Sequence, residues 1–211
     1  MTDTELEKRT AAEAGALLVE DGMIVGLGTG STVAHLLPAL ARRELRLRCI
    51  ATSPATERLA RELGLPVVPF DDLERLDIAI DGADQIDRAG WVVKGGGGAH
   101  AREKVVAAAA DRFVVIASSD KLVDSVAAPI PLELLRFGLA ATLLRVAPAE
   151  LRDAPPSPDN GVIADYLGEV DDPAVVAARL AAIPGVVDHG LFGPELVSEV
   201  LIGRGSEVER R

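Results

Sequence analysis

Short apolar runs alternate with helical patterns through the first 117 residues, and this alternation restricts the fold more than any other feature of the chain. The runs lie at residues 23–27, 47–51, 67–68, 76–80, 91–93 and 113–117. Helical patterns extend from Ser31 to about Arg42, from the N-cap pair Ser53-Pro54 to Gly64, and over about residues 99–110. Continuously apolar strands interleaved with helices are typical of a parallel sheet covered on both faces. The pattern therefore predicts an α/β fold with a mostly parallel sheet.

The pattern changes after about residue 127. Prolines at positions 129, 131, 148, 155, 156 and 158 divide the chain into short segments, and residues 155–161 form a strong turn signal. Beyond that turn, a strand is expected at 162–167, a helix at 173–183 and a strand at 186–192. This β-α-β order predicts a small second α+β subdomain, and the run at 197–202 is compatible with a strand that returns to the first sheet.

Composition and charge restrict the partners. The chain has 211 residues, 48% of them hydrophobic, which suffices for a core in one domain or two small ones. A net charge of -11 opposes binding to nucleic acid, and an aromatic content of 3% leaves few side chains for base stacking. The single cysteine, Cys49, is expected to be buried rather than nucleophilic. A charged N-terminus and the lack of a long apolar stretch predict a cytoplasmic protein with no membrane partner.

Four clusters of polar and glycine residues follow the apolar runs. The first lies in the turn Gly26–Thr32 and contains Thr29, Gly30, Ser31 and Thr32. Glycines let the backbone approach a ligand, and the N–H groups that open a helix favour an anion. The G-x-G-x-G spacing differs from the dinucleotide fingerprint, and the chain lacks the Gly-Lys pair of a P-loop. By itself, this turn is equally compatible with phosphate binding and with an ordinary tight turn.

The second cluster, Asp81-Gly82-Ala83-Asp84, follows the run at 76–80. Two carboxylates three residues apart can orient hydroxyl groups or share protons. The alternative is an aspartate in a turn followed by a helix cap, which would be favoured if this cluster stood alone.

The third cluster follows the run at 91–93 and consists of Lys94, the glycines Gly95, Gly96, Gly97 and Gly98, and the start of a helix. Four consecutive glycines are costly in chain entropy, and a loop whose amides wrap a ligand would justify them. Glu103 falls in the first helical turn, where the helix dipole favours an ionised carboxylate, so it is a candidate general base. The alternative is a solvated first-turn glutamate. His100 adjoins the loop and could contact a ligand or lie at the surface.

The fourth cluster, residues 118–121, ends in Lys121. Only four of the 22 basic residues are lysine, so Lys94 and Lys121 at the ends of apolar runs indicate a need for a compact ammonium group. The three histidines are scattered without ligand spacing, and no metal site is expected.

Together, these clusters resemble ribose-5-phosphate isomerase of the A type. The matching stretches are GLGTGST (26–32), DGADQID (81–87), KGGGGAHAREK (94–104), SSDKLV (118–123) and IPGVVDHGLF (183–192). The resemblance is strong over residues 1–125 and continues more loosely to about Gly203. The combination of DGAD with KGGGGA and REK is far more specific than any single glycine loop.

The resemblance implies an isomerase without metal or other cofactor that interconverts ribose 5-phosphate and ribulose 5-phosphate in the pentose phosphate pathway. It implies that Glu103 moves a proton between C1 and C2 through an enediol or enediolate. Asp81, Asp84 and Lys94 would assist ring opening and stabilise charge on the substrate oxygens. The substrate-binding set that it implies is Thr29, Gly30, Ser31, Thr32, Asp81, Gly82, Ala83, Asp84, Lys94, Gly95, Gly96, Gly97 and Lys121.

The resemblance also implies a Rossmann-like catalytic domain at residues 1–126, completed by about 198–211. A small α+β domain, ferredoxin-like in the family, would cover 127–197, and the protein would form a homodimer. Departures from the family pattern include Gln85, Arg136, Ser118, Asp120 and the altered turn Pro158–Val162, which lies in a shortened segment. They bear on the small domain and the subunit contacts more than on the chemistry.

Two other function classes stay open on the residues alone. One is a non-catalytic sugar-phosphate sensor, although the acidic stretch before Met23 offers no basic DNA-binding segment. The other is an acyl-CoA transferase or sugar-phosphate lactonase relative, which would share glycine loops but not DGAD followed by KGGGGA and REK.

Overall fold

The computed structural model describes residues 2–211, which form two compact units. Unit 1 contains the chain up to Ala83, Glu103–Lys121 and Glu195–Arg211, and unit 2 contains Asp84–Arg102 and Leu122–Pro194. A compact unit is a group of mutual contacts and need not fold alone, so the expected domain limits at 126 and 197 stay a prediction. The units do place residues 84–102 in the same group as residues 122–194.

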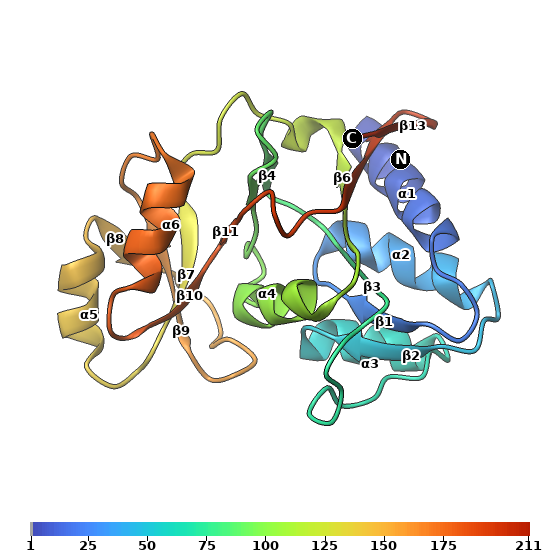
Figure 1. Cartoon of the computed structure of the whole chain (residues 1–211), viewed down its shortest axis with the longest axis horizontal. Coiled ribbons are helices and arrows are strands. Elements are labelled where there is room, and N and C mark those ends of the chain that lie inside the picture. Colours follow the sequence, from blue (N-terminus) through green and yellow to red (C-terminus); the bar gives the residue numbers. More distant parts are fainter. Residues whose placement is uncertain (1) are drawn as a thin grey trace. The chain divides into compact units, whose positions relative to one another are not determined.

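Unit 1 is built on a six-stranded sheet of order β13-β12-β6-β3-β1-β2 (Figure 1). The strands are β1 (Ile24–Leu27), β2 (Arg48–Ala51), β3 (Ile78–Asp81), β6 (Phe113–Ser118), β12 (Glu199–Arg204) and β13 (Glu207–Arg210). All neighbours pair in parallel except β12 and β13, which are antiparallel. The predicted parallel sheet is confirmed, and the run at 197–202 returns to it as β12, whereas Val67 makes only an isolated bridge to Cys49.

Helices cover both faces of this sheet. They are α1 (Asp3–Leu17), α2 (Ser31–Ala41), α3 (Pro54–Glu62) and α4 (His100–Ala109), and the short 3₁₀ helix η1 (Ser119–Lys121) directly follows β6. The predicted α3 cap is confirmed, because the Ser53 hydroxyl accepts the Thr56 N–H at 3.2 Å. At the end of α3, Gly64 adopts a φ of 79°, which favours glycine.

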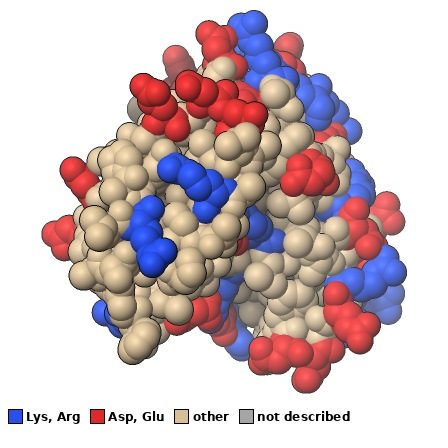
Figure 2. All heavy atoms as spheres, turned by 60° about the vertical axis from the view of Figure 1, so that its left-hand side comes forward, with Lys and Arg blue, Asp and Glu red and all other residues tan. Residues whose placement is uncertain are grey.

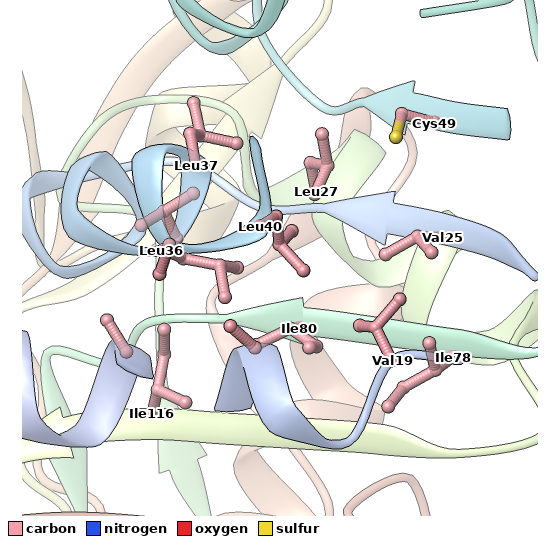
Figure 3. Packing of buried hydrophobic residues seen from close by; sticks show 14 of the residues in the cluster. Val19, Val25, Leu27, Leu36, Leu37, Leu40, Cys49, Ile78, Ile80 and Ile116 are labelled. Atoms are coloured by element: carbon pink, nitrogen blue, oxygen red, sulfur yellow. The ribbon is translucent and has the colours of Figure 1, made fainter. Parts of the chain in front are cut away.

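The main core of unit 1 lies between the sheet and helices α1 and α2 (Figure 3). Val25, Leu27, Ile80 and Ile116 of the strands meet leucines of α2, and all of them are fully buried. Gly26 faces the opposite side of β1, since side chains alternate along a strand. A Cβ on Gly26 would lie 2.4 Å from Val106 Cγ1 of α4, so α4 packs closely on that second face.

Cys49 is part of this core, as expected, and is fully buried (Figure 3). Burial raises the pKa of its thiol to about 12. The side chain therefore fills space and does not act as a nucleophile at neutral pH.

Unit 2 contains a four-stranded antiparallel sheet of order β10-β7-β9-β8. Its elements are β7 (Ile130–Leu134), α5 (Leu139–Val146), β8 (Ala149–Leu151), β9 (Val162–Tyr166), α6 (Pro173–Ala181) and β10 (Val186–His189). The chain order β-α-β-β-α-β with this strand order is the ferredoxin-like arrangement. One sheet face packs on the two helices through Leu132, Leu134, Ala164, Val146 and Leu180.

A second, three-stranded antiparallel sheet in unit 2 has the order β11-β5-β4. It comprises β4 (Gln85–Ile86), β5 (Val92–Val93) and β11 (Leu191–Phe192). The expectation that the run at 91–93 joins the parallel sheet is therefore wrong. The predicted strand at 186–192 divides at Gly190, where a Cβ would lie 2.1 Å from the Lys94 carbonyl oxygen.

Candidate active site

The first sequence cluster and residues 81–83 of the second lie at the carboxyl ends of β1 and β3 in unit 1, whereas Asp84 is grouped with unit 2. From β1 the chain passes through α2 to β2 on one side, whereas β3 lies on the other side of β1. This reversal of strand order is a topological switch point, where open α/β sheets bind their ligands. The glycine turn after Leu27 and the turn after Asp81 both leave the sheet here.

Asp81 is held against the glycine turn. Its side chain is 3% exposed, and Oδ1 accepts the N–H groups of Thr29 at 3.0 Å and Gly82 at 2.7 Å. A Cβ on Gly28 would lie 1.9 Å from Asp81 Cγ, so only glycine permits this approach. The structure thus brings Thr29, Asp81 and Gly82 together in a turn. The helix-cap part of the alternative is wrong, because strand β4 and not a helix follows Asp84.

Hydroxyl groups that the sequence reasoning missed support the same turn. Thr29 Oγ1 lies 2.8 Å from Thr52 Oγ1, which donates to the Leu27 carbonyl at 3.2 Å. The Thr56 hydroxyl at the start of α3 donates to the Gly28 carbonyl at 2.8 Å. The run of threonine and serine directly after the second predicted strand was the available signal, because its end meets the same edge of a parallel sheet.

The start of α2 is open to an anion. Gly30 occupies the N-cap position with a φ of 118° and supplies no side-chain cap. Ser31 is exposed, whereas Thr32 is buried. Uncapped N–H groups at a helix start, together with the positive end of the helix dipole, favour a bound phosphate or carboxylate.

Glu103 lies in the first turn of α4 and is 3% exposed. The alternative of a solvated first-turn glutamate is therefore wrong. Its place near the N-terminus of α4 favours the ionised carboxylate through the helix dipole. A buried carboxylate of this kind is suited to general acid–base chemistry.

Lys121 ends η1, and its Nζ lies 3.6 Å from an Asp120 carboxylate oxygen. The start of η1 is fixed by Glu7 of α1, a residue that the sequence reasoning missed. Glu7 Oε2 accepts hydrogen bonds from the Ser119 N–H at 2.9 Å and from the Ser119 hydroxyl at 2.8 Å. These hydrogen bonds lower the pKa of Glu7, so its carboxylate is ionised at neutral pH and anchors the turn.

In unit 2, Lys94 follows β5 and is 3% exposed. Its N–H donates to the Gly190 carbonyl at 2.9 Å, and its Nζ lies 5.6 Å from the centroid of the Phe192 ring. The expected compact ammonium group is thus held in a buried position beside an aromatic face, where a cation–π attraction stabilises it.

The glycine loop after Lys94 contacts Asp84. The Gly96 N–H donates to Asp84 Oδ2 at 2.8 Å, and a Cβ on Gly96 would lie 2.9 Å from Asp84 Oδ1. Gly95 adopts a φ of 104°, and a Cβ there would lie 2.7 Å from His100 Nδ1. His100 is fully buried, so the surface alternative for this residue is wrong.

The second face of the four-stranded sheet supports this loop. Pro131 lies beside Gly95, and Ile163 lies beside Gly98. Arg152 donates to the Gly95 carbonyl at 2.9 Å and to the Gly96 carbonyl at 3.1 Å. The sequence reasoning missed Arg152, because an arginine in a proline-rich connection carries no periodic signal.

Within residues 2–211, no group of three or more His, Cys, Asp or Glu side chains is arranged to hold a metal ion. None of the helices described is both long and apolar enough to cross a membrane.

Comparisons with known proteins agree with the motifs. Residues 48–207 match the family model for ribose 5-phosphate isomerase A (phosphoriboisomerase A). Ribose-5-phosphate isomerase A of Natronomonas pharaonis is 44% identical, with 99% of this chain and 97% of the relative covered. The Caulobacter vibrioides enzyme is also 44% identical, with 97% and 96% covered.

Solved structures of the same enzyme are also similar. The ribose 5-phosphate isomerase A of Methanocaldococcus jannaschii superposes with a TM-score of 0.91 at 32% identity, covering 97% of each chain. A D-ribose-5-phosphate isomerase in complex with phospho-erythronic acid has a TM-score of 0.92 at 31% identity, with 100% and 99% covered. The sequence match over nearly the whole chain, together with the parallel sheet, the ferredoxin-like sheet and the motifs that they carry, leads to one conclusion: this chain belongs to the ribose 5-phosphate isomerase A family of aldose–ketose isomerases.

Proposed function

We propose that this chain interconverts D-ribose 5-phosphate and D-ribulose 5-phosphate by proton transfer through an enediol or enediolate. The observation that carries the mechanism is the burial of Glu103 in the first turn of α4, directly after the lysine–glycine loop in the chain. The relative solved with phospho-erythronic acid supports a phosphorylated sugar-like substrate. A sugar acid places a planar, anionic carboxylate where an enediolate would carry its charge.

Glu103 is the proposed proton carrier. It removes the proton from C2 of the open-chain aldose, the electron pair of that C–H bond forms the C1–C2 double bond, and the π pair of the C1 carbonyl moves onto O1 to give the enediolate. The hydroxyl proton of O2 then passes to O1. A carbonyl re-forms at C2 while the double-bond pair takes the proton from Glu103 at C1, which gives the ketose. A positioned acid–base group of this kind contributes about 10²–10⁴ in rate, and burial limits loss of the proton to water.

Lys94, Asp81 and Asp84 are proposed to assist ring opening and to stabilise charge. The Lys94 ammonium is suited to a developing negative charge on the substrate oxygens, because it is fixed and largely removed from water. The carboxylates of Asp81 and Asp84 are each oriented by backbone N–H groups and can accept hydrogen bonds from sugar hydroxyls.

The remaining residues are proposed to bind the substrate. Uncapped amides and hydroxyls at the start of α2 are suited to a phosphate, and a lysine at the end of η1 adds positive charge. Amides of the two glycine turns are suited to sugar oxygens. The residues are Thr29, Gly30, Ser31, Thr32, Gly82, Ala83, Gly95, Gly96, Gly97 and Lys121.

We further propose a homodimer that forms through the α5 patch, defined as Leu135, Phe137 and Leu144. These side chains lie on α5 and the loop before it and are 50%, 93% and 81% exposed. Figure 2 turns this side of unit 2 forward and shows a wide, mostly uncharged surface that carries two basic groups. A second copy would remove this apolar surface from water. A cytoplasmic location and independence from cofactors stay predictions from the sequence.

The direct test is incubation of the purified protein with ribose 5-phosphate, with and without a metal chelator, while ketose formation is followed. The proposal predicts ribulose 5-phosphate at the same rate in both samples. Absence of ketose would favour the sensor alternative and contradict the isomerase assignment. Loss of activity with the chelator would contradict the metal-free mechanism.

A further inference from the structure

Arg152 joins three segments of unit 2 that are far apart in the sequence. It follows β8, and its Nε donates to Asp165 Oδ2 of β9 at 3.0 Å while Nη2 donates to Oδ1. Its Nη1 donates to the carbonyls of Gly95 at 2.9 Å and Gly96 at 3.1 Å. Four of the five N–H groups of a guanidinium are thus used, and the side chain is only 22% exposed.

By holding the carbonyls of Gly95 and Gly96, Arg152 also fixes the direction of the N–H groups of Gly96 and Gly97. A trans peptide is planar, so its C=O and the N–H of the next residue point in opposite directions. The peptide whose carbonyl faces Arg152 at Gly95 therefore presents the Gly96 N–H on the other side, where it donates to Asp84 Oδ2 at 2.8 Å. The same geometry at the next peptide turns the Gly97 N–H away from Arg152. Gly96 and Gly97 are exposed, which leaves that side open to a ligand.

The glycine loop needs such an external support. Glycine has more backbone freedom than any other residue, and Gly95 and Gly98 adopt φ values of 104° and 72°. Within the loop, a backbone hydrogen bond runs from the Gly98 N–H to the Gly95 carbonyl at 3.0 Å. The planar fork of arginine can meet two carbonyls and a carboxylate at once, whereas the three donors of a lysine diverge from one atom.

We propose that Arg152, with Asp165, is a positioning pair that sets the peptide planes of the glycine loop. Through those planes, the pair holds Asp84 in its catalytic orientation and presents the Gly97 amide to the substrate. Asp165 neutralises the guanidinium and fixes its plane. The roles of Asp84 and Gly97 in this inference rest on the proposed isomerase function.

The test compares Arg152→Lys with the wild type. Lysine keeps the positive charge next to Asp165 but loses the fork, so kcat should fall roughly 10- to 100-fold, as for a misplaced catalytic group. Arg179→Lys is the matched control. Arg179 contacts Tyr166, which follows Asp165 in β9 and faces the opposite side of the sheet, so its loss perturbs the same strand without touching the loop. A kcat within about twofold of the wild type in Arg152→Lys would overturn the proposal.

A double-mutant cycle separates positioning from general support. If Arg152 acts through Asp84, adding Arg152→Lys to Asp84→Asn should lower kcat little further, since the group to be positioned is already lost. If the fold loss in kcat of the double variant equals the product of the two single losses, Arg152 acts independently of Asp84, and the inference is overturned.

Amide exchange keeps the inference testable without activity. Hydrogen exchange at the Gly96 N–H should be faster in Arg152→Lys than in Arg179→Lys or the wild type. If the wild type makes no ketose but this difference is found, the proposed function fails while the positioning pair stands. Unchanged exchange in an active protein would overturn the positioning pair alone.

Discussion

At the scale of single residues, the absence of a side chain at Gly28 leaves room for the carboxylate of Asp81. The carboxylate of Asp81 occupies the volume that a Cβ on Gly28 would take, at 1.9 Å from Cγ. In that position it accepts the N–H groups of Thr29 and Gly82. Backbone N–H groups therefore fix one oxygen of Asp81 at the glycine turn.

Gly28→Ala should displace Asp81 and lower both activity and stability. A core position that is overpacked in this way loses about 1–3 kcal/mol of the free energy of unfolding. Urea denaturation and the ketose assay would measure the two effects. The stability control is Gly82→Ala, whose Cβ would meet nothing closer than 3.9 Å and should cost less than about 0.5 kcal/mol. Equal stability of the two variants would contradict this account of Asp81.

The candidate residues differ in how far the sequence could reveal them. Glu103 and Lys94 follow from a motif whose glycines need a ligand to justify them, but their burial required the structure. Arg152 and Glu7 could not be found, because their partners are 57 and 112 residues away in the sequence. Such contacts depend on tertiary packing, which leaves no local pattern.

At the scale of elements, Glu133 of strand β7 connects this strand to the turn 157–161 through a hydrogen bond. This side chain is 2% exposed, and its Oε1 accepts the Ser157 hydroxyl. A Cβ on Gly161 would lie 2.4 Å from the same oxygen, so the turn is packed closely on the carboxyl group. The Ser157 hydroxyl also accepts the Gly161 N–H at 2.9 Å.

Glu133 should make stability depend on pH. Burial raises the pKa of Glu133 above its ordinary value of 4.5, and the Ser157 hydrogen bond offsets part of this effect. Between the two values the folded chain keeps a proton that the unfolded chain has lost, so stability falls as the pH rises through that range. The Glu133→Gln variant carries no such charge, and its stability relative to the wild type should increase from about pH 5 to about pH 8.

Urea denaturation at the two pH values would measure this difference. Glu150→Gln is the control, because Glu150 is an exposed residue of the same sheet. A Glu133→Gln effect that is the same at both pH values would show that the carboxyl group stays ionised throughout.

The elements that the sequence predicted correctly are those with continuous apolar runs or clear caps, such as β6 and α3. The run at 91–93 was assigned to the wrong sheet, because Val92 and Val93 are buried on both faces and look the same in either sheet. Helix α5 was not predicted. It has only eight residues and lies between prolines, so its short length hides it in the sequence.

The net charge of -11 restricts partners only at the scale of the whole molecule. It opposes a long polyanion, but a small phosphate responds to local groups such as amides, hydroxyls and one lysine. Lys94 is an example of such a local group, because this positive charge is buried next to the Phe192 ring whatever the net charge of the chain. An acidic protein and an anionic substrate are therefore compatible.

The oligomeric state tests the α5 patch. The double variant Phe137→Glu with Leu144→Glu places charges on the proposed dimer interface and should sediment as a monomer, whereas the wild type should sediment as a dimer. Leu17→Glu changes a leucine of unit 1 that is 70% exposed, and should leave the dimer intact. A wild-type monomer, or a double variant that stays dimeric, would contradict the proposed interface.

The most direct test of the central claim is the reaction of Glu103→Gln with ribose 5-phosphate in deuterium oxide. The substitution keeps the shape of the side chain and removes its ability to carry the proton. We predict unchanged folding and substrate binding, a loss of roughly 10²–10⁴ in kcat, and a matching loss of deuterium incorporation into the ketose. Ketose formation and deuterium incorporation at the rates of the wild type would contradict the assignment of Glu103 as the group that moves the proton.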